Sequence, residues 1–171
     1  MRHFVSLAAC AALLVVSPLL QAQDDDAAAV ELEVTKKAPD ASVATRLAAK
    51  DTPYTVDDDG DYRILVNVGD DRSQLVWVRS IVHKTDAQHV REIWTYGLRS
   101  EERRIPAHIA NRLLSENMDL IVGAWARQDG NAILVLKINA DADADTLDEA
   151  IDLAASIGDR MEKKLGTGDD L

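Results

Sequence analysis

The hydrophobic positions of this 171-residue chain follow two different periods, which predict three helices and several strands. Apolar residues at helical spacing predict a first helix over residues 41–50, which ends before Pro53. A second helix is expected to begin at Pro106, because a missing N–H costs nothing at the first position of a helix. The apolar side of that second helix is formed by Ile109, Leu113, Leu114 and Met118.

The third helix is expected near the end of the chain. Thr146 and Glu149 have the spacing of a capping box, with Thr146 as the N-cap residue. Gly158 stands where a large side chain would be expected, which indicates close approach to another element. The apolar stripe of this helix consists of Leu147, Ile151, Ala154, Gly158, Met161 and Leu165.

The segments between the helices have the composition and spacing of strands. Residues 57–60 and the pair Asp129-Gly130 have turn sequences that predict hairpins. Residues 90–98 fit a strand, but their apolar residues would also lie on one helical face, so both interpretations stay open. The other expected strands cover residues 54–56, 61–68, 74–83, 120–126 and 132–138.

The order of elements, α-β-β-β-(β)-α-β-β-α, predicts an α+β domain. We expect an antiparallel sheet of about five strands with helices on one face. A sheet that is covered on one face should alternate apolar and polar residues. Residues 75–78, 120–122 and 133–136 are instead continuously apolar. The second face is therefore expected to be shielded by other segments of the chain, by a second copy in a homodimer, or by a partner.

The first 22 residues have the order of a secretory signal peptide. Arg2 gives a basic start, residues 4–20 are mostly apolar, and cleavage is expected after the small residue Ala22. The protein is then periplasmic or secreted, with no stable membrane anchor after cleavage. Cys10 follows small residues, so its lipidation stays open, as does a retained anchor. Cys10 is also the only cysteine, so the cleaved chain would contain neither a thiol nor a disulfide.

The chain is expected to have four parts. These are a signal peptide (1–22), a flexible acidic linker (23–40), the α+β domain (41–166) and a disordered tail (167–171). The chain has 19 lysines and arginines against 30 aspartates and glutamates, for a net charge of −11. Because nucleic acid and many membrane surfaces are also anionic, neither is expected as a partner.

The sequence assigns no catalytic, cofactor-binding or metal-binding residue, and we expect a protein that is not an enzyme. The acidic run 57–61 contains a glycine, but Thr55 and Val66 occupy two positions where a calcium loop needs carboxylates. A hairpin turn is the better interpretation of this run. The histidines outside the leader have no metal-ligand spacing and are interpreted as scattered surface residues: His83, His89 and His108.

The element order and several segments resemble the type III secretion chaperone fold and its YbjN-like relatives. Residues 53–61 are similar to the opening hairpin of that family, and residues 73–78 to its third strand. Residues 109–114, followed by residues 123–125, resemble its central helix and next strand. The closing helix is similar over residues 145–165, so that the resemblance spans about 41–165.

The resemblance implies a small, acidic, usually dimeric protein that holds extended segments of other proteins, without catalysis or a cofactor. The signal peptide departs from this pattern, because secretion chaperones act in the cytoplasm. The resemblance therefore implies only the shape and a general capacity to bind protein.

Trp94 and Tyr96 are the candidate partner-binding residues, since their segment is charged, whereas Trp77 and Trp125 are expected in the core. We expect an exported binding module that recognises a protein segment, by strand addition at a sheet edge for example. The alternative is a small-molecule-binding or hydrolytic envelope protein. That alternative would need a deep pocket that encloses His83 or His108 beside a carboxylate.

Overall fold

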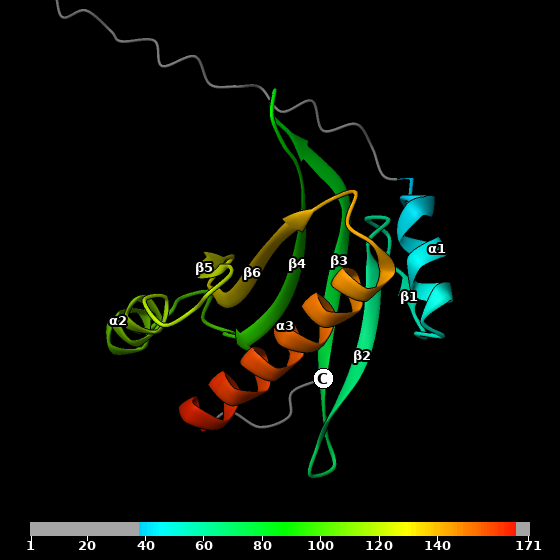
Figure 1. Cartoon of the computed structure of the whole chain (residues 1–171). Helices are drawn as coiled ribbons and strands as arrows, with labels where there is room; N and C mark the ends of the chain where they lie inside the picture. The colour runs from blue at the N-terminus through cyan, green and yellow to red at the C-terminus, as the bar shows by residue number, and fades with distance from the viewer. Residues whose placement is uncertain (1–37, 167–171) are drawn as a thin grey trace, which may run out of the picture. The chain divides into compact units, whose positions relative to one another are not determined.

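The structure, a computed structural model, describes residues 38–166, all of which belong to the unit formed by residues 35–171. The predicted signal peptide, most of the predicted linker and the predicted tail lie outside the described residues. In chain order (Figure 1) the elements are α1 (Ala41–Ala49), β1 (Thr55–Val56), β2 (Tyr62–Gly69), β3 (Arg72–Lys84), β4 (His89–Leu98), α2 (Ala107–Glu116), β5 (Ala124–Gln128), β6 (Asn131–Asn139) and α3 (Ala144–Leu165).

The strands form one antiparallel sheet in the order β1-β2-β3-β4-β6-β5. This confirms the predicted α+β class, but the sheet has six strands rather than about five. The segment 90–98 is strand β4, and it lies between β3 and β6. The helical interpretation of this segment is therefore wrong: every second residue from Arg91 to Gly97 is buried, which is the period of a strand.

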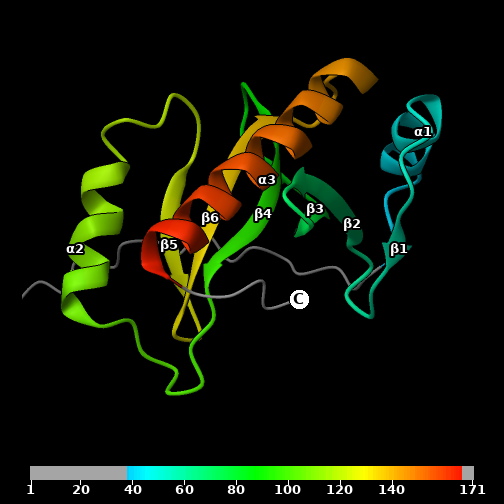
Figure 2. The ribbon, with the colours of Figure 1, turned by 90° about the horizontal axis from the view of Figure 1, so that it is seen from below.

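One face of the sheet is covered by α3, which crosses the central strands obliquely (Figure 2). Alternate residues of these strands point under α3, and the apolar stripe predicted for this helix packs on them. Helix α1 adds Val43 and Leu47 to the same core, and α2 adds Leu113 beside β5. The strand and α3 residues at the centre of the core are Val76, Val78, Ile93, Leu134, Leu136, Leu147, Ile151, Ala154 and Met161.

Two of the predicted hairpin turns are confirmed. At the turn between β5 and β6, Asp129 and Gly130 have φ angles of 50° and 91°, as a tight turn with two left-handed residues requires. At the turn before β2, a side-chain oxygen of Asp57 accepts the N–H groups of Asp59 and Asp61 at 3.0 Å. The acidic run is therefore organised as a turn by hydrogen bonds from its own backbone to the Asp57 side chain.

Helix α3 begins three residues earlier than the capping-box pattern predicts. Its N-cap is Asp143, whose Oδ1 accepts the N–H of Thr146 at 2.9 Å, so the prediction of Thr146 as the N-cap is wrong. A carboxylate is a strong cap because it also faces the positive end of the helix dipole, and the hydrogen bonds from Thr146 lower the pKa of Asp143. The predicted close approach at Gly158 is confirmed: a Cβ there would lie 2.9 Å from side-chain atoms of Gln74 and Thr95.

The region between α2 and β5 differs most from the predictions. Pro106 is the N-cap of α2 rather than its first residue. Leu114 and Met118, predicted on the apolar side of that helix, are 65% and 86% exposed, and the helix ends at Glu116. Strand β5 begins at Ala124, four residues later than predicted. No helix within residues 38–166 is long and apolar enough to cross a membrane.

Candidate functional site

No described helix covers the face of the sheet opposite α3 (Figure 2). Several large side chains lie on this face. These side chains alternate along each strand with the core residues, as the pleat of a sheet requires. Both candidate residues of the sequence, Trp94 and Tyr96, lie on this face and are partly exposed. We call it the open face; its residues are Arg63, Leu65, Leu75, Trp77, Arg79, Glu92, Trp94, Tyr96, Ala124, Ala126, Ile133, Val135 and Lys137.

The strand register aligns one row of these residues across five strands. The row consists of Arg63, Trp77, Trp94, Val135 and Ala124. The prediction of Trp77 as a core residue is wrong, because its neighbours Val76 and Val78 are buried against the core whereas Trp77 is partly exposed. Trp125 is 6% exposed and belongs to the core, as predicted. Successive residues of a strand point to opposite faces, and this alternation places Trp77 on the open face and Trp125 in the core.

Arginine side chains stack on the aromatic rings of the open face. The Arg79 guanidinium lies 4.1 Å from the Trp94 ring centroid, and that of Arg99 lies 4.6 Å from the Tyr96 centroid. Trp77 and Tyr96 meet edge to face at 5.3 Å, and Arg63 lies 5.9 Å from the Trp77 centroid. Such cation–π contacts fix an arginine from one side. We call these residues, Arg63, Trp77, Arg79, Trp94, Tyr96 and Arg99, the aromatic ladder.

The position of Arg79 in the aromatic ladder is fixed by a buried carboxylate. Asp61 is 2% exposed; its Oδ1 accepts the N–H of Ser80 at 2.7 Å, and its Oδ2 lies 2.9 Å from Arg79 Nε. Burial raises the pKa of Asp61, although the bond from Ser80 and the charge of Arg79 act in the opposite direction. The turn before β2 thereby holds a guanidinium over Trp94.

The polar atom of Trp94 is satisfied within the open face. Its Nε1–H donates to Glu92 Oε2 at 3.0 Å. Lys137 Nζ lies 3.6 Å from Glu92 Oε1, and His83 Nε2 lies 3.8 Å from Oε2. Trp94 therefore offers a partner its apolar ring rather than a hydrogen-bond donor.

Beside Trp94 the open face is hollowed into a groove of about 720 Å³. Ala124 and Ala126 of β5 leave room that larger side chains would fill, and residues 121 and 122 form a wall. Ile121 is fully exposed and Val122 is 41% exposed, so this wall is accessible. The apolar residues of the groove are Trp94, Ile121, Val122, Ala124, Ala126, Ile133 and Val135.

The outer edge of β5 is closed in part by a side chain. Asn117, the residue after α2, accepts the N–H of Trp125 on its Oδ1 at 2.7 Å and donates its Nδ2–H to the Trp125 carbonyl at 3.4 Å. The amide occupies the backbone groups that an added strand would need. Strand addition at β5 would therefore have to displace Asn117.

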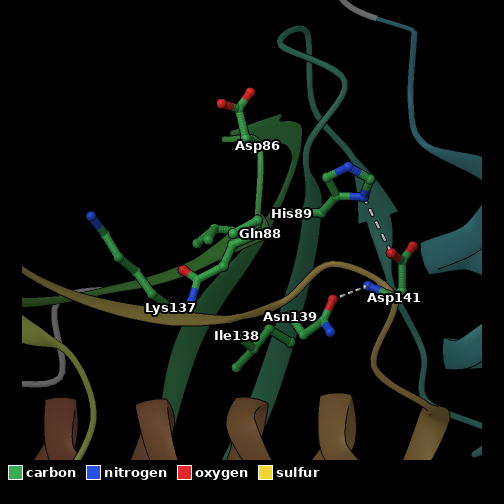
Figure 3. A pocket seen from close by; sticks show the side chains of 9 residues that line it. Asp86, Gln88, His89, Lys137, Ile138, Asn139 and Asp141 are labelled. Atoms are coloured by element: carbon green, nitrogen blue, oxygen red, sulfur yellow. Dashed lines mark hydrogen bonds and ion pairs between the residues drawn. The ribbon is translucent and has the colours of Figure 1, made fainter. Parts of the chain in front are cut away.

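The three histidines within residues 38–166 are dispersed over the surface. His83 lies beside Glu92 of the open face, and His108 is exposed on α2. His89 lines a cavity of about 540 Å³ at the end of the β3–β4 hairpin (Figure 3), with its Nδ1 3.3 Å from Asp141 Oδ2. Both side chains are largely exposed, at 47% and 76%. Within residues 38–166, no group of three or more acidic, histidine or cysteine residues is placed to hold a metal ion.

Most residues of the open face were not identified from the sequence. In the sequence, Arg63 and Arg79 are indistinguishable from other charged residues. Ile133 and Val135 belong to a continuous apolar run. The alternation of residues along β3 and β4 could have indicated the residues of the open face. This would have required knowledge of the register, in which Trp77 pairs with Trp94. A scan against protein-family models and a search of the curated proteins found no match for this chain.

Proposed function

We propose that this protein is an exported, non-enzymatic domain that binds a segment of a partner protein on its open face. The observation that carries the proposal is the aromatic ladder beside an apolar groove, on a face that no described helix covers. Contiguous exposed apolar surface with tryptophan, tyrosine and arginine is typical of protein interfaces. Trp94 and Tyr96 are the central partner-binding residues in this proposal.

The order of the elements supports the same proposal. It agrees with the resemblance to type III secretion chaperones and YbjN-like proteins, and we include this fold type in the proposal. The site of action, the periplasm or the outside of the cell, is proposed from the leader sequence that ends at Ala22.

The chemistry of the open face also favours binding over catalysis. Its ionisable groups stack on rings or pair with one another, as Arg79 does with Asp61 and Lys137 with Glu92. The alternative envelope enzyme would need His83 or His108 in a deep pocket beside a carboxylate. His83 stands 3.8 Å from Glu92 but is 39% exposed, and it does not line the groove.

The proposal can be tested by photo-cross-linking in the living cell. A photoreactive residue replaces Leu75 on the open face of the tagged full chain, and a second version carries it at Asp152 on α3. We expect one abundant adduct with another protein from position 75, and none from position 152. The double substitution Trp94→Ser and Tyr96→Ser should remove at least about nine-tenths of this adduct, because interface tryptophan and tyrosine contribute strongly to affinity.

The matched control is Leu153→Ser, which removes an apolar side chain that is 38% exposed on α3. This control should leave the adduct unchanged. Thermal unfolding of each variant separates binding from folding. An unchanged adduct in the double variant would contradict the role of Trp94 and Tyr96, and its unfolding would assign these residues to the stability of the sheet.

A further inference from the structure

The groove and the aromatic ladder together indicate the chemistry of the partner. The groove is apolar and shares Trp94 with the ladder, so the two form one surface across the sheet. The groove lies over β4, β6 and β5, whereas the ladder extends over β3 to Arg63 on β2. A segment that crosses the strands would contact both.

The surface is more cationic than the chain as a whole, which has a net charge of −11. The basic side chains on or beside it are Arg63, Arg79, Arg99, Arg127 and Lys137. The acidic ones are Glu92, Asp61, which pairs with Arg79, and the turn residues Asp57 and Asp59, which line a hollow beside Trp77 and Trp94. Glu92, the carboxylate that lines the groove, is already engaged by Lys137 and by the Trp94 N–H. The surface therefore favours negatively charged groups.

Two of the arginines are prepared to receive such groups. No described residue offers a carboxylate to Arg63 or to Arg99, whereas Arg79 is paired with Asp61. Each guanidinium is fixed on one side by an aromatic ring. A guanidinium that stacks on an aromatic ring can still donate the N–H groups at its edge to a carboxylate.

We infer that the open face recognises an acidic segment of a partner protein that contains one large apolar side chain. The apolar side chain enters the groove beside Ala126, and the carboxylates on either side of it reach Lys137 and the arginines Arg63 and Arg99. This inference rests on the proposed function. A second copy of the chain fits less well, because it would bring the cations of two open faces together.

The test uses the full chain and a short, capped, fluorescent peptide in which glutamates alternate with valine around a central phenylalanine. Fluorescence anisotropy measures its binding. We expect a peptide with glutamine in place of each glutamate to bind about tenfold more weakly. Replacement of the phenylalanine by alanine should weaken binding by a similar factor, because the groove would lose its occupant.

Two variants locate the site, and each has a control. Ala126→Leu fills the groove at an exposed position and should weaken binding about tenfold, whereas Ala48→Leu, exposed on α1, should not change it. The double variant Arg63→Gln and Arg99→Gln should bind more weakly and lose much of the salt dependence. Arg104→Gln is its charge control, because Arg104 is exposed, pairs with Glu102 and does not line the groove.

Equal binding of the glutamate and glutamine peptides, or full binding by Ala126→Leu, would overturn the inference. Binding of a medium-chain fatty acid, with no peptide binding, would overturn it in favour of a small amphipathic carboxylate. None of these results would change the outcome of the cross-linking test of the proposed function. A different outcome is that the peptide binds as expected while the living cell gives no adduct at position 75. In that case the proposed function is wrong, and the inferred preference of the open face for acidic segments still holds.

Discussion

Asp159 illustrates how much of the domain's stability a single charged residue controls. It lies on α3 and is 7% exposed, yet it contacts two cations: Arg72 Nε at 2.6 Å and Lys163 Nζ at 2.9 Å. Burial alone would raise the pKa of Asp159. The hydrogen bonds and charges of Arg72 and Lys163 outweigh burial and lower this pKa below its usual value of 3.8.

We expect Asp159→Asn to lower the free energy of unfolding by about 1.5–3 kcal/mol at neutral pH, the range for hydrogen bonds to charged groups. Because the folded-state pKa is lowered, the contribution of Asp159 is fully present above pH 3.8, and it is lost as the pH falls through the folded-state pKa. The stability difference between wild type and variant should therefore shrink in strong acid. Urea unfolding at several pH values measures it.

Asp145→Asn is the control for this prediction. Asp145 lies on the same helix as Asp159 and pairs at 2.9 Å with Lys50, the C-cap of α1, but the Asp145 side chain is 86% exposed. Exposed pairs contribute little, so this variant should change the stability by less than about 1 kcal/mol. A difference for Asp159→Asn that does not depend on pH would contradict the role given to its charge.

At the scale of elements, one residue makes several polar contacts that join the start of α1 to the sheet. Asp40, its N-cap, accepts the N–H of Ser42 and pairs with the buried guanidinium of Arg91. Its backbone carbonyl accepts the Tyr62 hydroxyl at 2.9 Å, and its N–H donates to Ser80 Oγ at 3.0 Å. Although Asp40 ends the predicted linker, it therefore connects α1 to β2, β3 and β4.

We expect Arg91→Met to release α1. Arg91 is 2% exposed and also donates to the carbonyl of Ser80 at 3.3 Å, so its removal leaves Asp40 and backbone carbonyls without their partner. Loss of one member of a buried pair costs about 3–5 kcal/mol, and a value near the lower limit is expected because Asp40 is 30% exposed. Amide hydrogen exchange should accelerate in α1 before it does in α3.

Arg104→Met is the matched control for this substitution. The Arg104 side chain is 74% exposed and pairs with the equally exposed Glu102. Its loss should leave exchange in α1 unchanged. Uniform acceleration over every element in Arg91→Met would show that Arg91 stabilises the whole domain rather than the attachment of one helix.

At the scale of the whole described domain, the two faces of the sheet are unequal. One face packs against α3 and α1, and the open face carries exposed aromatic and cationic groups. A homodimer could cover this face, but it would bring Arg63 and Lys137 of both copies together. An acidic partner would instead form ion pairs with these cations.

We therefore expect a monomer by light scattering at high micromolar concentration. A dimer that dissociates in Trp94→Ser with Tyr96→Ser would show that the open face is a self-interface, in conflict with the inferred partner. A dimer that survives this double substitution would locate self-association elsewhere and leave the open face to another partner.

Much of the fold could be predicted from local patterns. Hairpins at residues 57–60 and 129–130 follow from residues that tolerate left-handed backbone, and the stripe of α3 follows from helical periodicity. The start of strand β5 was not predicted correctly. The apolar run 120–122 has the composition of a buried strand, but Ile121 is fully exposed and the strand begins at Ala124. The prediction that Leu114 and Met118 lie on a packed side of the helix is wrong for the same reason. Apolar character does not reveal which side of an element is covered.

The sequence by itself determined the class of the domain, most of its turns, the close approach at Gly158, and an excess of apolar residues in the strands. These features depend on neighbours within a few residues. Only the tertiary structure decided that Trp77 joins Trp94 and Tyr96 on the open face while Trp125 enters the core. The physical reason is register: a strand exposes opposite faces at successive residues, and the pairing with other strands determines which face meets α3.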